Sequence, residues 1–150
     1  MNFLGGSPKR KEILREKQLA HIAETLSFGE LLTGCGLNQE LSLIRPGDTR
    51  WSSHFRSLKN VLSMFPAILE SLETIADAHA HDHSDKVKAL SILNMLMTFD
   101  FIFIALLMGS IFGLTNSLNM TLQKMDQDIV NAMKLVDSTK LGLQKLQDNG

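Results

Sequence analysis

A long apolar stretch in the second half of the chain limits the possible folds most strongly. Over residues 87–114 the sequence is almost entirely apolar, and Asp100 is the only charged residue between Lys88 and Lys124. A helix that is apolar on all sides is either buried in a helical assembly or inserted in a membrane. An ionised Asp100 at the middle of a bilayer would be costly, and Asn94 and Thr98 add polar atoms. We therefore predict one or more core helices over 87–114, with a membrane span as the less favoured alternative.

An amphipathic pattern over residues 49–76 predicts a second helix. Asp48 or Thr49 can cap its start. Its apolar positions follow at alternating steps of four and three, which makes a heptad seam; they are Trp51, Phe55, Leu58, Leu62, Phe65, Leu69, Leu72 and Ala76. Pro66 removes the N–H that would bond to the Leu62 carbonyl, so we expect the helix to bend or split there.

A third amphipathic pattern covers residues 115–147. Thr115 or Asn116, which follow Gly113, are candidate caps for its start. Its apolar seam consists of Leu118, Leu122, Met125, Ile129, Met133 and Val136. A helix of this kind has one face available for packing against a partner.

The first third of the chain is more polar. Residues 1–32 predict a basic N-terminal helix, with Ser7 as cap and Pro8 at the first helical position. Residues 33–48 are rich in turn formers and predict a loop with one extended piece around 41–44. Residues 77–86 are rich in His and Asp and predict a linker. We therefore expect one all-α segment, elongated or loosely packed, of about four to five helices.

The composition limits which partners the protein can attract and in which cellular compartment it is expected. The 150 residues suit one domain, and a net charge of −1 gives no overall attraction to nucleic acid or anionic membrane. Cys35 is the only cysteine, which excludes an internal disulfide and fits a reducing compartment. The N-terminus lacks the apolar run of a signal peptide. These features predict a nuclear or cytoplasmic protein.

Two clusters carry candidate binding chemistry. His79, His81 and His83 are weak metal-ligand candidates, because side chains two positions apart on a helix point away from each other; we favour a solvated linker. The basic residues Lys9, Arg10 and Lys11 are candidates for phosphate contact, although a run of this kind usually forms a solvated face. No glycine-rich phosphate loop or cysteine pair is present in the sequence, and we expect no cofactor.

The segment RPGDTRWSSHF at residues 45–55, preceded by GLNQEL, resembles plant proteins related to hAT-family transposases, of the zinc-finger MYM-type-like or TTF-type. The resemblance extends over nearly the whole chain through KRKEILREKQ, FGELLTGCGLNQE, MFPAILESLE, FDFIFIALLMGSIFGLTNSLNMTLQKMDQDIVNAM and LVDSTKLGLQKLQ. It implies part of an all-helical insertion in a ribonuclease-H-like domain. The catalytic acidic residues and the dimerisation segment of the family would lie outside this chain, so we expect no catalysis.

The resemblance also implies a contact with transposon-end DNA. The Thr-Arg-Trp motif matches at Thr49, Arg50 and Trp51, where the tryptophan would stack on a flipped base and the arginine would lie near phosphate. Ser52 and Phe55 replace the glycine and tyrosine of related sequences. The heptad seam begins at Trp51, so packing also explains much of that residue.

The opposite face of the helix over 49–76 carries Arg50, His54 and Ser57, which are the better candidates for DNA contact. Two interpretations stay open. The chain is either a non-catalytic module that contacts nucleic acid or protein, or a purely structural helical domain that forms homo- or hetero-oligomers through its amphipathic helices.

Overall fold

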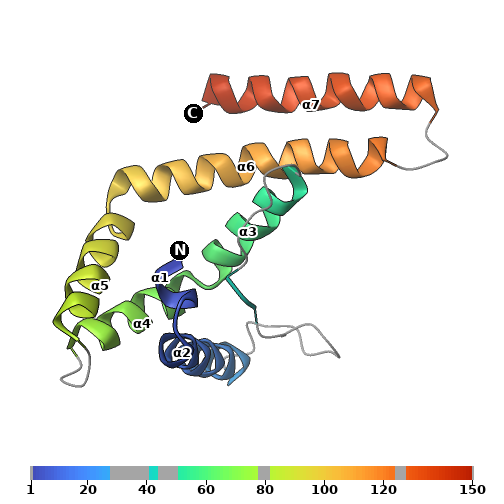
Figure 1. The fold of residues 1–150 in the computed structure, drawn as a ribbon. Helices are drawn as coiled ribbons and strands as arrows, with labels where there is room; N and C mark the ends of the chain where they lie inside the picture. The colour runs from blue at the N-terminus through green and yellow to red at the C-terminus, as the bar shows by residue number, and fades with distance from the viewer. Residues whose placement is uncertain (1, 28–40, 44–50, 78–81, 124–127, 150) are drawn as a thin grey trace. The chain divides into compact units, whose positions relative to one another are not determined.

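The computed structural model of the protein describes residues 2–27, 41–43, 51–77, 82–123 and 128–149, and within these ranges every regular element is a helix (Figure 1). The prediction of an all-α fold is confirmed. The helices are α1 (Asn2–Gly5), α2 (Pro8–Ser27), α3 (Trp51–Ser63), α4 (Phe65–Asp77), α5 (His83–Leu96), α6 (Phe99–Leu122) and α7 (Ile129–Asn149).

The chain divides into two compact units, where the sequence suggested a single segment. Unit 1 comprises Met1–Arg45 and Asn60–Ile102, and unit 2 comprises Pro46–Lys59 and Phe103–Gly150. The boundaries fall inside α3 and α6, so each of these helices contributes residues to both units.

Unit 1 is built around α4, which contacts both α2 and α5, while α1 contacts α2. Ile68, Leu72 and Ile75 of α4 are at most 1% exposed and form the centre of the core. Leu14 of α2 and Leu96 of α5 are buried in the same cluster. Burying a side chain of this size contributes about 1.5–3 kcal/mol, so α4 supplies much of the stability of unit 1.

The helix predicted over 49–76 is split at Met64, as Pro66 led us to expect. α3 ends at Ser63 and α4 starts at Phe65. Met64 N donates to Asn60 O at 2.9 Å, and Ile68 N donates to Met64 O at 2.9 Å, so the backbone bonds continue around the turn. Pro66 lies in the first turn of α4, where a missing N–H leaves no bond unmade.

The described part of the predicted loop over 33–48 is residues 41–43, which are not helical. They are held to α2 by Gln18, which is 5% exposed. With the side-chain amide of Gln18 oriented so that its nitrogen faces Leu41 O and its oxygen faces Leu41 N, Gln18 donates to Leu41 O at 3.0 Å and accepts from Leu41 N at 2.7 Å. Asn60 Nδ2 donates to Ser42 O at 3.0 Å. Two side-chain amides therefore satisfy three backbone groups of this segment, which are Leu41 N, Leu41 O and Ser42 O.

α5 and α6 begin at positions that the sequence did not indicate. α5 begins at His83, so the linker predicted over 77–86 overlaps its first turn. The apolar stretch breaks at 97–98, where Thr98 Oγ1 accepts a hydrogen bond from Phe101 N at 3.3 Å. Thr98 thus serves as the cap of α6 and satisfies one of the free N–H groups of its first turn.

The predicted boundary between residues 114 and 115 is wrong, because α6 continues to Leu122. Thr115 Oγ1 donates to Ile111 O at 3.0 Å, which is the bond of a threonine inside a helix and not that of a cap. The seam predicted from Leu118 to Val136 is therefore divided between α6 and α7. The N-terminal prediction was closer, since α2 begins at Pro8 and Ser7 O accepts from Lys11 N at 3.0 Å.

Candidate interaction surface

The most unusual feature of unit 2 is the exposure of its most apolar helix. Several large apolar side chains of α6 are exposed, and a cluster of four near its start is here called the α6 apolar surface: Phe103, Ile104, Leu106 and Leu107, which are between 36% and 57% exposed. Ala105 is the one described residue of α6 that is buried. A helix of this composition normally lies inside a core, so its exposed apolar side chains make it the candidate interaction surface of unit 2.

The same helix meets the length and composition of a membrane span. α6 is 24 residues long, its most apolar 18-residue window has a mean hydropathy of 1.9, and only 6% of that window is buried within the described structure. α6 begins at Phe99, so Asp100 lies in its first turn and not at its middle. The cost of burying Asp100 at a bilayer centre is therefore a weaker argument against insertion than the sequence suggested.

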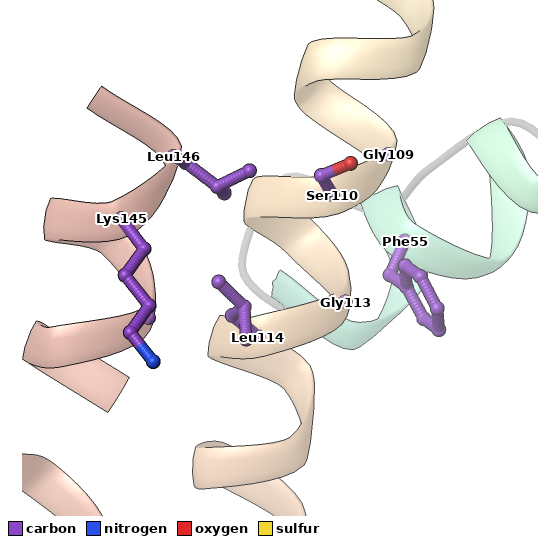
Figure 2. Close-up of a pocket in the computed structure, with 8 residues that line it drawn as sticks. Phe55, Gly109, Ser110, Gly113, Leu114, Lys145 and Leu146 are labelled. Atoms are coloured by element: carbon purple, nitrogen blue, oxygen red, sulfur yellow. The ribbon is translucent and has the colours of Figure 1, made fainter. Parts of the chain in front are cut away.

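Next to the α6 apolar surface lies an open, mostly apolar groove of about 620 Å³ in unit 2, formed by α3, α6 and α7 (Figure 2). Its lining consists of Phe55, Gly109, Ser110, Gly113, Leu114, Gly142, Lys145 and Leu146. In Figure 2, Leu114 projects from α6 and Leu146 from α7 into the space between the two helices. Among the described lining residues, Lys145 is the one with a charged side chain.

Glycines allow the helices of unit 2 to approach closely. A Cβ atom at Gly113 would lie 3.7 Å from Phe55 Cε2, and one at Gly142 would lie 3.3 Å from Leu114 Cδ2. The phenyl ring of Phe55 thus rests on the Gly113 backbone of α6. α6 continues through Gly113, although the sequence suggested a boundary there.

The α3 residues predicted to contact DNA do not lie on a fully exposed polar face. His54 is half-buried, and its ring centroid lies 6.2 Å from that of Phe112 at an interplanar angle of 41°. Ser57 is also half-buried. We expected both side chains to lie on the outward face of the helix, but α6 occupies part of that face. Arg50 and the side chain of Trp51 lie outside the described residues.

The basic candidates of unit 1 have different environments. Lys9 and Lys11 are exposed on α2. Arg10 is bound within unit 1: it forms an ion pair with Asp85 of α5, and its Nε donates to Phe3 O at 2.9 Å. Its guanidinium also lies 4.4 Å from the centre of the Phe3 ring. Arg10 therefore connects α1, α2 and α5, and Lys9 and Lys11 remain the accessible candidates for phosphate contact.

The described part of the chain contains no group of three or more His, Cys, Asp or Glu side chains placed to hold a metal ion. His83 is exposed at the start of α5. His79 and His81 lie outside the described residues.

Comparison with family models, with curated proteins and with solved structures finds no match to this chain.

Sequence reasoning missed the residues that form the groove in unit 2. The spacing of four between Gly109 and Gly113 was a usable signal, since it places both glycines on one side of a helix. The contribution of Gly142 and Leu146 had no local signal, because it depends on the packing of α7 against α6.

Proposed function

We propose that this chain is a non-catalytic helical module related to the hAT-family transposases, and that it binds another protein through the α6 apolar surface. The observation that carries the proposal is the exposure of Phe103, Ile104, Leu106 and Leu107. The segments that resemble the transposase-derived proteins support the relationship, and α6 lies within the longest of them.

Covering the α6 apolar surface contributes favourable free energy to association. Full burial of an apolar side chain of this size contributes about 1.5–3 kcal/mol. Since each of the four side chains is roughly half exposed, covering them would contribute on the order of 1 kcal/mol each. A few such contacts, together with the neighbouring groove, can offset part of the entropy that association costs.

A protein partner fits α6 better than a bilayer does. Residues 101–114, in which Ser110 is the one polar side chain, span about 21 Å at 1.5 Å per residue, whereas the hydrocarbon core is about 30 Å thick. Beyond them come Thr115, Asn116 and Ser117, which are polar. Membrane insertion is the second candidate function, favoured by the length and hydropathy of the whole helix.

Contact with DNA stays a prediction for Arg50, Trp51, His54 and Ser57 and for Lys9 and Lys11. Because Trp51 is the only tryptophan, its fluorescence reports on that prediction directly. Quenching of a red-shifted signal by single-stranded or hairpin DNA would support a contact. A blue-shifted signal that does not respond would exclude stacking by Trp51.

The proposal is tested with Leu106→Gln, which removes apolar area from an exposed position, and with Leu19→Gln as a matched control at a 47% exposed leucine of α2. We expect Leu106→Gln to reduce the binding of a hydrophobic dye and the size of the species in gel filtration, with Leu19→Gln close to the wild type. Equal effects of both changes would contradict a specific surface on α6. Retention of the wild-type chain in membranes after carbonate extraction would favour the second candidate.

A further inference from the structure

The outer side of α7 carries a stripe of exposed residues with an ordered charge sequence. Its members are separated by steps of three, four, four and three, which places them on one face of the helix; they are Lys134, Asp137, Leu141, Lys145 and Asp148, here called the α7 outer stripe. All five are exposed, and Leu141 at the centre is 64% exposed. Gly142 and Leu146 line the groove with Leu114 of α6, and Lys145 of the stripe also borders this groove while staying exposed.

The charges of the α7 outer stripe are arranged symmetrically about Leu141 but with opposite signs. Lys134 and Asp148 are each seven residues from Leu141, and Asp137 and Lys145 are each four residues from it. Within the described part of the chain, none of these four side chains forms an ion pair. Asp148 accepts a long hydrogen bond from Gln144 Nε2 at 3.5 Å. The order from the N-terminus is positive, negative, leucine, positive, negative.

We propose that the α7 outer stripe binds the same stripe of a second copy of this chain in the antiparallel direction, with the two-fold axis at Leu141. In that arrangement Lys134 faces Asp148 of the second copy, and Asp137 faces Lys145. Each of these two ion pairs occurs twice in the dimer, because both subunits contribute the same surface to a two-fold interface. The two Leu141 side chains pack on each other at the axis.

The charge order selects the antiparallel direction. A parallel pairing in register would place Lys134 against Lys134 and Asp137 against Asp137, which is repulsive at every charged position. Charged residues that flank an apolar contact set partner choice and orientation between helices. Exposed ion pairs contribute little energy each, so the stripe specifies the direction of a weak dimer. Lys145 also borders the groove beside α6, but the stripe contains no residue of the α6 apolar surface, and the proposal does not depend on the function proposed for α6.

Disulfide cross-linking tests the geometry in the full-length chain, with Cys35→Ser as background. Leu141→Cys would place two thiols at the axis and is expected to give a covalent dimer under mild oxidation. Lys134→Cys would place them fourteen residues apart along the helix, about 21 Å, which exceeds the reach of a disulfide. Cross-linking at both positions, or at neither, would overturn the proposal.

A charge exchange tests the pairing itself. Asp137→Lys and Lys145→Asp are each expected to weaken the dimer roughly tenfold in sedimentation equilibrium at low salt, and the double variant is expected to restore it. If the double variant dimerised no more tightly than the single variants, the proposal would be overturned. Repeating the cross-linking in Leu106→Gln separates this dimer from association through α6: the Leu141→Cys dimer is expected to persist there, and its loss would contradict an independent interface.

Discussion

Replacing Arg10 with alanine distinguishes a structural role for this residue from the phosphate contact that the sequence suggested. Arg10 makes three interactions in unit 1: the ion pair with Asp85, the hydrogen bond to Phe3 O and the contact with the Phe3 ring. All three are lost in Arg10→Ala, and Asp85 is left partly buried without its partner. We therefore expect the main effect of this change to be on the stability of unit 1.

The magnitude follows from the environment of each contact. The Arg10 and Asp85 side chains are 17% and 23% exposed, so their pair lies between an exposed one, worth up to about 1 kcal/mol, and a buried one, whose disruption costs about 3–5 kcal/mol. The hydrogen bond adds about 1 kcal/mol and the ring contact about 0.5–1 kcal/mol. Because these terms share one side chain and do not add fully, we expect a loss of about 2–3 kcal/mol.

Thermal unfolding followed by circular dichroism measures this loss. A destabilisation of about 2–3 kcal/mol in a unit of this size lowers Tm by roughly 10–20 °C. Lys9→Ala, at an exposed position of the same helix, is expected to change stability by less than about 0.5 kcal/mol. A double-mutant cycle with Asp85→Ala should give a coupling of about 1–2 kcal/mol. The reasoning is refuted if Arg10→Ala unfolds at the wild-type temperature.

Three further changes test the packing by thermal or denaturant unfolding. Leu72→Ala, at a residue with no exposed surface, should cost about 3 kcal/mol or more, whereas Leu90→Ala, at a leucine 47% exposed, should cost under about 1 kcal/mol. Thr98→Ala removes the cap of α6 and should cost about 1 kcal/mol. Gly113→Ala should stabilise unit 2 by about 0.5–1 kcal/mol, since its new methyl group would lie in ordinary contact with Phe55.

Each of these expectations has a contradicting result. Similar losses for Leu72→Ala and Leu90→Ala would mean that α4 is not the centre of the core. If Thr98→Ala left the free energy of unfolding unchanged, the break at 97–98 would not depend on the cap. A destabilised Gly113→Ala would show that α3 and α6 approach more closely than the structure indicates.

Local signals in the sequence were sufficient for the helical class and for several helix ends. Pro8 and Pro66 were informative, because proline restricts the backbone wherever it occurs. The break at 97–98 was missed because no glycine or proline marks it. The opposite error occurred at Gly113 and Thr115, which look like the end of one helix and the start of another. In α6 the glycine accommodates Phe55 and the threonine bonds to the carbonyl of Ile111.

Contacts between distant parts of the chain had no signal in the sequence. Arg10 and Asp85 are separated by 75 positions, and nothing near either residue indicates the pair. His54 was assigned to an outward face from helical periodicity alone, yet Phe112 of α6 lies beside it. The exposure of the α6 apolar surface also differs from the sequence prediction of core helices over 87–114, since only 6% of the most apolar window of α6 is buried against the described residues.

The measurement that tests the central proposal most directly is photo-cross-linking in cells from a photoreactive residue at position 106, with position 19 as control. Both positions are exposed leucines, but only Leu106 lies on the α6 apolar surface. We predict protein adducts from position 106 that are lost when Phe103→Gln is added, and few adducts from position 19. Adducts only with lipid, or equal protein adducts from both positions, would contradict a protein-binding surface on α6.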